Sequence, residues 1–339
     1  MANDRSAAVR QAKVAPRTFS VAALPPFRLD LTVWALRRRH DNTIDRWDGR
    51  TYRRSLPLGT GGIELAAVQA GSGAVPELTV TLTGAQLDEE TEEAARAALA
   101  RLLGFELDLS KFYRLAAGDP FLQTLAARFR GLKPPRFPTL FECLVNAIAC
   151  QQLTLTVGIR LLNRLAEAHG TPPAASNTPA FPLPTQLADL SPEALRPLGF
   201  SGAKSRSIIE LAARVGTGML DAAAIETLDD DAALTALLRL RGVGRWTAEY
   251  ALLRGLGRLH VFPGDDVGAR NNLTRWLDRR EPLDYAGVQA AVRGWQPFAG
   301  LVYFHLLLAN LADHGVVAES SSSAAASEFG DDVRRQELR

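Results

Sequence analysis

The sequence LRGVGRWTA at residues 240–248 predicts two helices joined by a tight hairpin. Gly242 and Gly244 in this hairpin permit positive φ angles and let another backbone approach closely. Backbone N–H groups beside a helix N-terminus form a concave site for an anion such as a DNA phosphate. A carboxylate, Asp266, follows about twenty residues later. A phosphate anchor with a carboxylate beside it predicts chemistry on the sugar of a nearby nucleotide, and hence removal of a base from DNA.

Two short patterns around the hairpin narrow this interpretation. They are Arg245-Trp246-Thr247-Ala248-x-Tyr250 and, further along the chain, Phe262-Pro263-x-Asp265-Asp266. Together with the hairpin, these patterns resemble the helix-hairpin-helix (HhH-GPD) DNA glycosylase superfamily. Within that superfamily they are most similar to the bacterial 3-methyladenine DNA glycosylase II (AlkA-like) family. The resemblance extends over about residues 25–315.

The resemblance implies a fold and an activity. The expected fold is mainly α, a helical HhH-GPD domain preceded by a small α+β domain with an antiparallel sheet. The expected enzyme flips alkylated bases of the 3-methyladenine type out of double-stranded DNA. It then excises them hydrolytically in base excision repair and leaves an abasic site. The expected partner is duplex DNA containing damaged bases, and no cofactor is required.

Asp266 is the predicted catalytic residue. Breaking the C1′–N bond leaves an oxocarbenium-like sugar, which a nearby carboxylate stabilises while it helps to align or deprotonate water. The alternative is that Asp266 serves only as the N-cap of the helix that follows it. Asp265 is the better candidate for that cap and the second candidate for the catalyst.

The position of Trp246 bears on the mechanism. By resemblance, bifunctional relatives carry a lysine here, which attacks C1′ and forms a Schiff base before strand cleavage. The chain has only four lysines, none of them in the hairpin: Lys13, Lys111, Lys133 and Lys204. We therefore expect a monofunctional enzyme that uses water.

Four side chains are the candidates for the base pocket: Trp246, Tyr250, Tyr303 and Leu307. Trp246 and Tyr250 offer aromatic faces, and stacking on a base is worth ~1–3 kcal/mol. Both are alternatively core aromatics. Leu307 replaces a tryptophan that the resemblance implies near the end of the last helix, which leaves Tyr303 or Phe304 as the aromatic surface there.

The DNA contacts are expected to begin at the hairpin. Gly242, Val243 and Gly244 would offer backbone N–H groups to a phosphate, and the Thr247 hydroxyl would add a further donor. By resemblance, the further candidates for DNA contact are Arg245, Gln152, Leu153, Lys204 and Arg270. The resemblance also implies a possible monovalent cation on the backbone carbonyls of Leu238, Leu240 and Val243.

Gln152 is the nearest match to the side chain that fills the gap left by a flipped nucleotide, and Leu153 is adjacent to it. An ordinary polar helix C-terminus explains Gln152 equally well. Lys204 and Arg270 are alternatively solvated surface residues. These alternatives stay open at the level of the sequence.

Composition limits the class of protein. The chain has 339 residues, 47% of them hydrophobic, and a net charge of +2, which fits a globular protein of two domains. No membrane helix and no secretory signal are visible, so we expect a cytoplasmic, nucleoid-associated monomer. The only two cysteines are Cys143 and Cys150. That number excludes the four-cysteine iron–sulfur cluster found elsewhere in the superfamily.

The expected organisation has four parts. Residues 1–16 and 318–339 are expected to be a disordered lead and tail, and residues 17–115 and 116–317 to be the α+β and the helical domain. Within the α+β domain, alternating apolar residues predict a strand at Phe27–Val33. Further strands are expected at residues 51–58, 63–68 and 78–82, and a helix at residues 89–103.

Two other functions remain open. The closest is a glycosylase for another lesion, such as uracil, hypoxanthine or an oxidised purine, because Leu307 alters the pocket. The second is a non-catalytic helix-hairpin-helix module that binds the DNA backbone. Asp266 argues against such a module, because an anion beside a phosphate weakens simple binding.

Overall fold

The five strands form one antiparallel sheet in the order β1-β5-β4-β3-β2. They are β1 (Arg17–Ala22), β2 (Arg46–Trp47), β3 (Thr51–Leu56), β4 (Ile63–Ser72) and β5 (Val75–Gly84). The alternating pattern correctly predicted β3, β4 and β5. It missed β1 and the two-residue β2, both of which lie at the edges of the sheet. The mainly helical fold with a preceding antiparallel sheet is confirmed.

The fold is that of a computed structural model. It describes residues 15–59, 61–72, 75–174 and 176–317. The predicted tail, and the predicted lead apart from its last two residues, lie outside this part of the chain. Among the described residues, no helix is long and apolar enough to cross a membrane.

The strand predicted at Phe27–Val33 is wrong, because this segment begins helix α1 (Leu29–Arg37). Every residue of α1 except Asp30 is buried. One side of the helix packs toward the sheet and the other toward the C-terminal helices. A helix that is covered on nearly all sides lacks the single apolar stripe that identifies a helix from its sequence.

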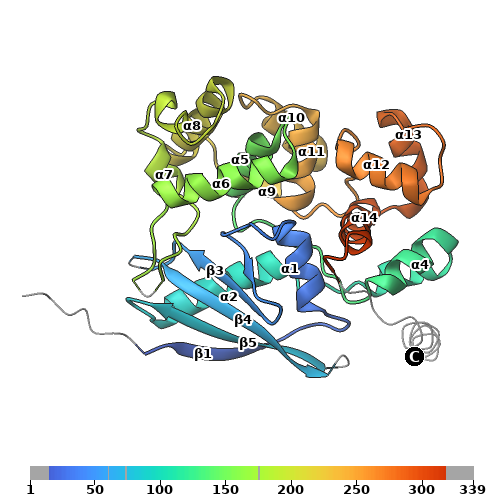
Figure 1. The fold of residues 1–339 in the computed structure, drawn as a ribbon, viewed down its shortest axis with the longest axis horizontal. Coiled ribbons are helices and arrows are strands. Elements are labelled where there is room, and N and C mark those ends of the chain that lie inside the picture. Colours follow the sequence, from blue (N-terminus) through green and yellow to red (C-terminus); the bar gives the residue numbers. More distant parts are fainter. Residues whose placement is uncertain (1–14, 60, 73–74, 175, 318–339) are drawn as a thin grey trace, which may run out of the picture.

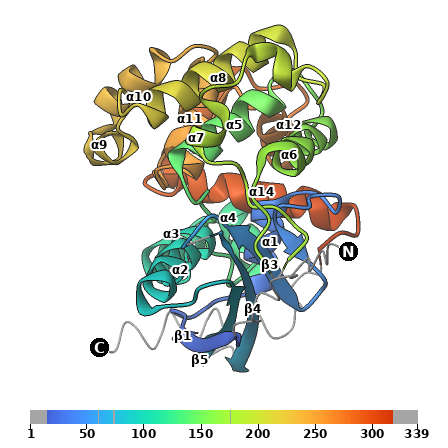
Figure 2. The same ribbon diagram turned by 90° about the vertical axis from the view of Figure 1, so that its left-hand side faces the viewer.

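Helix α2 (Glu89–Leu103) occupies the range predicted for it. The Asp88 side chain accepts a hydrogen bond from the Thr91 N–H, which caps the helix and fixes its start. Figures 1 and 2 show α2 against the sheet, with most of the other helices on the opposite side of α1.

The remaining chain is almost entirely helical. Its helices are α3 (Ser110–Ala117), α4 (Pro120–Arg128), α5 (Leu140–Cys150), α6 (Leu155–His169), α7 (Pro184–Leu187), η1 (Pro192–Leu195), α8 (Gly202–Gly216), α9 (Ala222–Thr227), α10 (Asp230–Leu238), α11 (Arg245–Arg254), α12 (Val267–Trp276), α13 (Tyr285–Val292), η2 (Arg293–Trp295) and α14 (Ala299–Asp313).

Three hydrophobic clusters hold these elements together. One lies between the sheet and helices α1 and α2. A second joins α5, α6, α8, α10 and α11, and a third joins α1, α3, α4, α12, α13 and α14. Helix α1 contributes to two of these clusters, and the predicted domain boundary at residues 115 and 116 falls inside α3. The two-domain division therefore stays a prediction.

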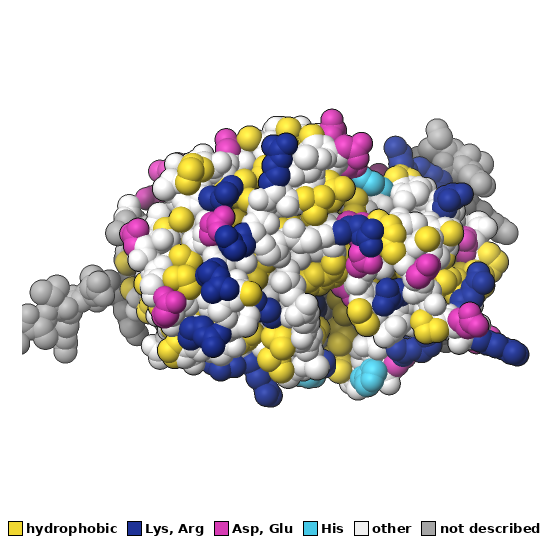
Figure 3. Space-filling view, turned by 90° about the horizontal axis from the view of Figure 1, so that it is seen from above, with side chains coloured by type: hydrophobic (Ala, Val, Ile, Leu, Met, Phe, Trp, Pro, Cys, Tyr) yellow, Lys and Arg dark blue, Asp and Glu magenta, His cyan; other side chains and the backbone are white. Residues whose placement is uncertain are grey.

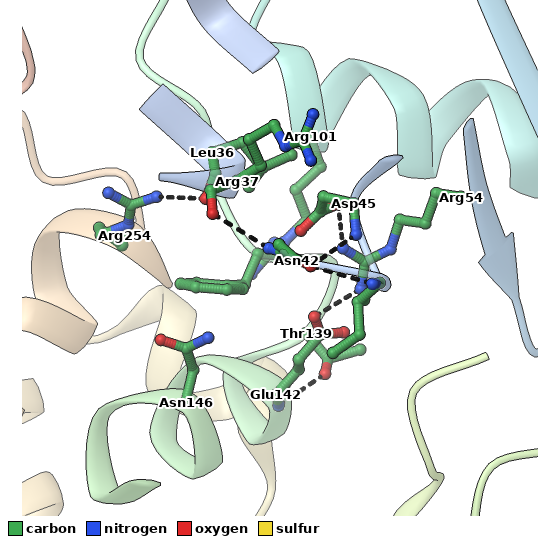
Figure 4. Close-up of polar contacts among 12 residues, drawn as sticks. Leu36, Arg37, Asn42, Asp45, Arg54, Arg101, Thr139, Glu142, Asn146 and Arg254 are labelled. Carbon is green, nitrogen blue, oxygen red and sulfur yellow. Dashed lines mark hydrogen bonds and ion pairs between the residues drawn. The ribbon is translucent and has the colours of Figure 1, made fainter. Parts of the chain in front are cut away.

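A buried ion triad ties the sheet to helix α5 (Figure 4). Arg54 of β3 donates to Asp45 Oδ1 at 2.6 Å and to Glu142 Oε1 at 2.5 Å. The three side chains are 1%, 4% and 7% exposed. The Tyr52 hydroxyl also donates to Asp45, at 2.8 Å. These contacts hold α5 against the sheet. The C-terminal end of α5 leads into the turn at Gln152.

Candidate functional site

The predicted hairpin joins α10 to α11. Gly242 has φ +75°, and a Cβ built there would lie 2.4 Å from Ser207 Oγ. Gly244 is the N-cap of α11 with φ −99°, and a Cβ there would meet no atom within 4 Å. Packing and conformation therefore require glycine at position 242. At position 244 glycine instead leaves open space in front of the N-terminus of α11.

Asp266 lies at the start of α12 and accepts three hydrogen bonds. Its Oδ1 accepts from the Ala269 N–H at 2.9 Å. Its Oδ2 accepts from the Trp246 Nε1–H at 3.1 Å and from the Tyr303 hydroxyl at 3.2 Å. A carboxylate has about four acceptor sites, so one of them is left free. The three donors hold the half-buried carboxylate in one orientation.

The prediction that Asp265 is the better helix cap is wrong, because Asp266 is the N-cap of α12. Asp265 lies one residue too early to reach the first turn. Its Oδ2 accepts instead from Arg245 Nε at 2.6 Å. Capping uses only Oδ1 of Asp266, so the other oxygen remains directed at the aromatic residues.

The ion pair of Arg245 extends into a second polar chain. The Arg245 guanidinium lies 3.8 Å from the ring centroid of Tyr285. The Tyr285 hydroxyl donates to Glu249 Oε1 at 2.6 Å, and Glu249 Oε2 accepts from the Gly264 N–H at 3.1 Å. Burial, with Glu249 beside it, raises the pKa of Tyr285 to about 12, so its hydroxyl stays a donor. This chain fixes the loop before Asp266 against α11.

Two aromatic side chains, Trp246 and Tyr303, contact the carboxylate, and further rings pack against them. The rings of Trp246 and Tyr250 lie 5.5 Å apart, and Tyr303 packs against Phe262 at 5.7 Å. Burial, followed by the charge of Asp266, raises the pKa of Tyr303 well above its usual range, so its hydroxyl stays protonated and donates. Trp246 and Leu307 are half-buried, whereas Tyr250 and Tyr303 are buried. Leu307 lies one turn beyond Tyr303 on α14.

The turn after α5 carries the two candidates for insertion into DNA. Gln152 has φ +55°, a left-handed conformation that favours glycine, and its side chain is exposed. Leu153 is 43% exposed, which is unusual for a large apolar residue beside a core helix. Both side chains therefore face outward from this turn.

Gln151, which the sequence analysis did not single out, ties this turn to the hairpin. Its Nε2 donates to the Gly242 carbonyl at 2.7 Å and to Thr247 Oγ1 at 2.8 Å. Thr247 is only 1% exposed. Its hydroxyl is thus engaged beneath the hairpin, whereas we expected it to face a phosphate. No local pattern signals this contact, because its partners are distant in sequence.

Besides Arg245, two cations were predicted near DNA, and they differ in their surroundings. Lys204 Nζ donates to the carbonyls of Ala149 and Gln151 at 2.8 and 2.7 Å. Partial burial lowers the pKa of this ammonium. Arg270 is half-buried on α12, and its Nε has no hydrogen-bond partner among the described residues. Lys204 therefore stabilises the C-terminal end of α5. The charge of Arg270 is available for a phosphate.

The backbone before and within the hairpin bears on the implied cation. The Leu240 carbonyl accepts from the Val243 N–H at 3.2 Å. Carbonyl oxygens are suitable ligands for a hard cation. Across the described ranges, no cluster of three or more His, Cys, Asp or Glu side chains could hold a metal ion.

Figure 3 shows the helical face that lies opposite the sheet. Lys and Arg side chains are spread over it among apolar and uncharged groups. Two arginines of the hairpin region, Arg241 and Arg245, are 58% and 53% exposed, and both pair with carboxylates. Basic charge is therefore dispersed, so phosphate binding at this face depends on local features such as the hairpin N–H groups.

Comparison with known proteins gives consistent matches. Residues 145–297 match the family model described as HhH-GPD superfamily base excision DNA repair protein. A DNA-3-methyladenine glycosylase of Bacillus subtilis is 30% identical over 205 residues, covering 59% of this chain and 68% of the relative. DNA-3-methyladenine glycosylase 2 of Escherichia coli is 28% identical over 288 residues, covering 80% and 96% of the two chains.

The fold itself has a solved counterpart. The 3-methyladenine DNA-glycosylase of Archaeoglobus fulgidus superposes with a TM-score of 0.77 and 23% identity. The match covers 88% of this chain and all of the other (100%). It therefore includes both the sheet and the helical region.

Proposed function

Since the chain belongs to the HhH-GPD superfamily of base excision DNA repair proteins, we propose that it is a monofunctional 3-methyladenine DNA glycosylase whose catalytic carboxylate is Asp266. The observation that carries this proposal is the placement of Asp266. Its carboxylate lies between Trp246 and Tyr303, beside a hairpin with open space at Gly244.

The carboxylate acts on the sugar. As the C1′–N bond breaks, positive charge develops on the deoxyribose, and the negative Asp266 stabilises it. The remaining acceptor site of Asp266 then orients water for attack on C1′ and takes its proton. Hydrogen bonds from Trp246 and Tyr303 already hold the carboxylate in position, so it does not have to reorient during this step. An alkylated purine is already cationic, so it departs as a neutral base without acid assistance.

The hairpin anchors the DNA through its backbone. We assign the phosphate contact to the N–H groups at Gly242, Val243 and Gly244, where the N-terminus of α11 adds its partial positive charge. Gln152 and Leu153 face outward from the neighbouring turn, which suits one of them to fill the gap in the duplex. Arg270 supplies free positive charge near the catalytic carboxylate. Trp246 and Leu307 form the accessible part of the base pocket.

The two glycines of the hairpin provide a paired prediction. Gly242→Ala is expected to lower the free energy of unfolding by about 2 kcal/mol or more, because of its positive φ and the Ser207 contact. The methyl group of Gly244→Ala meets no neighbour, so this variant is expected to lose only the N-cap preference for glycine, about 1 kcal/mol of the free energy of unfolding. Its methyl group blocks the phosphate approach, and DNA affinity falls about tenfold. Chemical unfolding and DNA titration measure the two effects. An unchanged affinity in Gly244→Ala contradicts the assigned anchor.

The absence of a nucleophilic lysine predicts the products. Among the described residues, Lys204 is the only lysine near the hairpin, and its ammonium donates to two carbonyls. Borohydride is therefore expected to trap no covalent enzyme–DNA complex, and strands with an excised base break only after alkali. Gel electrophoresis of a single-lesion duplex measures both outcomes. A trapped complex that disappears in Lys204→Ala overturns the monofunctional assignment.

We also propose a structural monovalent cation at the hairpin. The carbonyls of Leu238, Leu240 and Val243 would hold it, and it would add positive charge beside the phosphate. Of these, the Leu240 carbonyl already accepts one backbone hydrogen bond and has a second lone pair to offer. The catalytic step at Asp266 does not involve the ion.

A further inference from the structure

A buried arginine reaches the back of the aromatic wall beside Asp266. Arg38 directly follows α1 and is 6% exposed. Its Nη1 donates to the Tyr250 hydroxyl oxygen at 3.0 Å, and its Nη2 donates to Asn146 Oδ1 at 2.8 Å. The Tyr250 hydroxyl donates in turn to the same Oδ1, at 3.2 Å. Arg38 Nε is buried without a hydrogen-bond partner.

The backbone at Arg38 is strained. Its φ is +62°, and it occupies the left-handed C-cap position of α1. Glycine is the usual residue at such a position, and a side chain there costs about 1–2 kcal/mol. Strain of this kind persists where a side chain has a role that compensates for it. At this position the side chain extends to Tyr250, far away in sequence.

The charge of Arg38 is not neutralised by an ion pair. An arginine remains protonated in proteins, and among the described residues its guanidinium donates to Tyr250 and Asn146, while the charge of Asp45 acts on it from further away. A second buried guanidinium, that of Arg254, donates to the carbonyls of Ala35 and Leu36 at the end of α1 (Figure 4). It lies 5.6 Å from the ring centroid of Tyr250. Two positive charges therefore lie behind the same tyrosine.

The tyrosine between these charges and the pocket is neutral. Burial raises the pKa of Tyr250 to about 12, so its hydroxyl keeps its proton. The ring of Tyr250 packs against Trp246, which donates to Asp266. A charge in such a water-poor region acts over several ångströms with little screening. The two guanidiniums thus place positive charge behind Tyr250, and Asp266 places negative charge on the other side of Trp246.

We propose that Arg38 sets the lesion preference of this site, because its buried charge favours the departure of neutral damaged bases relative to cationic ones. This inference rests on the proposed function. Arg38 is a positioning residue that acts through Tyr250 and through its field.

The electron count explains the preference. In both cases the C1′–N bond breaks, its electron pair goes to the base, water oxygen bonds to C1′ and the water proton passes to Asp266. A base that was neutral leaves as an anion and then takes a proton from solvent. A cationic alkylated base leaves neutral. Measured from the free enzyme and DNA, the guanidinium therefore stabilises the transition state of a neutral base, which becomes anionic, and repels that of a cationic base, which still carries positive charge.

The test compares kcat/KM, measured at subsaturating enzyme, for release of hypoxanthine, a neutral base, and of 7-methylguanine, a cationic one, from matched duplexes. Arg38→Gln removes the charge and keeps a polar side chain. We expect it to slow hypoxanthine release about tenfold or more and to change 7-methylguanine release less than about threefold. Arg38→Lys keeps the charge, so its ratio of the hypoxanthine rate to the 7-methylguanine rate is expected to be close to that of the wild type. Arg38→Gly, which relaxes the backbone, is a second neutral variant should Arg38→Gln fail to fold.

Arg37 supplies a matched control. It is also buried, but within the described part of the chain its guanidinium donates to three backbone carbonyls, those of Arg39, His40 and Trp47. Arg37→Met is expected to lower stability and leave the ratio of the two rates unchanged. An equal loss of both rates in Arg38→Gln, or a wild-type enzyme that releases only 7-methylguanine, overturns the role of Arg38. Release of neither base by the wild type instead contradicts the proposed function itself.

Discussion

Replacing Asp266 with Asn is expected to slow release of 3-methyladenine at least about 100-fold, while the protein stays folded and bound to DNA. Asparagine caps helices as well as aspartate does, so its oxygen can still accept from the Ala269 N–H. What the variant loses is the negative charge facing the sugar. Single-turnover kinetics on methylated duplex DNA, with circular dichroism and DNA titration alongside, measure the three quantities.

Asp265→Asn is the matched control for this prediction. This carboxylate is adjacent in sequence but pairs with Arg245 at the surface, where the side chains are 30% and 53% exposed. Its replacement is expected to change the rate less than about threefold, since exposed ion pairs contribute little. Wild-type release by Asp266→Asn, or equal losses in both variants, is incompatible with Asp266 as the catalyst.

Replacing Arg54 with Met is expected to lower the free energy of unfolding by about 3–5 kcal/mol. The change leaves two carboxylates, Asp45 and Glu142, buried without their guanidinium. Burial already raises the pKa of Glu142 against the pull of Arg54, so loss of the arginine raises it further. Denaturant unfolding monitored by fluorescence measures the loss.

The loss of stability in Arg54→Met is expected to depend on pH. In Arg54→Met the folded state binds more protons than the unfolded state, so stability falls as the pH rises. The difference in free energy of unfolding between the wild type and Arg54→Met is therefore expected to be smaller near pH 5 than near pH 8. Arg53→Met is the control, because Arg53 pairs with Asp48 at the surface and its side chain is 38% exposed. If Arg54→Met lowers the free energy of unfolding no more than Arg53→Met does, the buried ion triad does not stabilise the fold as proposed.

Local sequence patterns predicted the elements whose surroundings are simple. Strands β3, β4 and β5 have one face toward the core, so their residues alternate, and Asp88 marks the start of α2. Helix α1 was mistaken for a strand because it is covered on almost every side. Its burial depends on helices that follow much later in the chain, which no window around α1 contains.

The candidate site divides in the same way. The hairpin glycines and Asp266 carry a spacing that the sequence displays directly. The roles of Gln151, Lys204 and Arg38 depend on contacts with residues far along the chain, so nothing next to them indicates those contacts. Asp265 and Asp266 are adjacent and chemically identical. Only the start of α12 determines which one caps the helix and which one pairs with Arg245.

Chromatography of the bases that the wild-type protein releases from methylated duplex DNA tests the central claim most directly. We expect 3-methyladenine to appear as a free base while the strands remain intact until alkali is added. DNA that is bound tightly without release of any methylated base would contradict it and would favour a helix-hairpin-helix module that only binds.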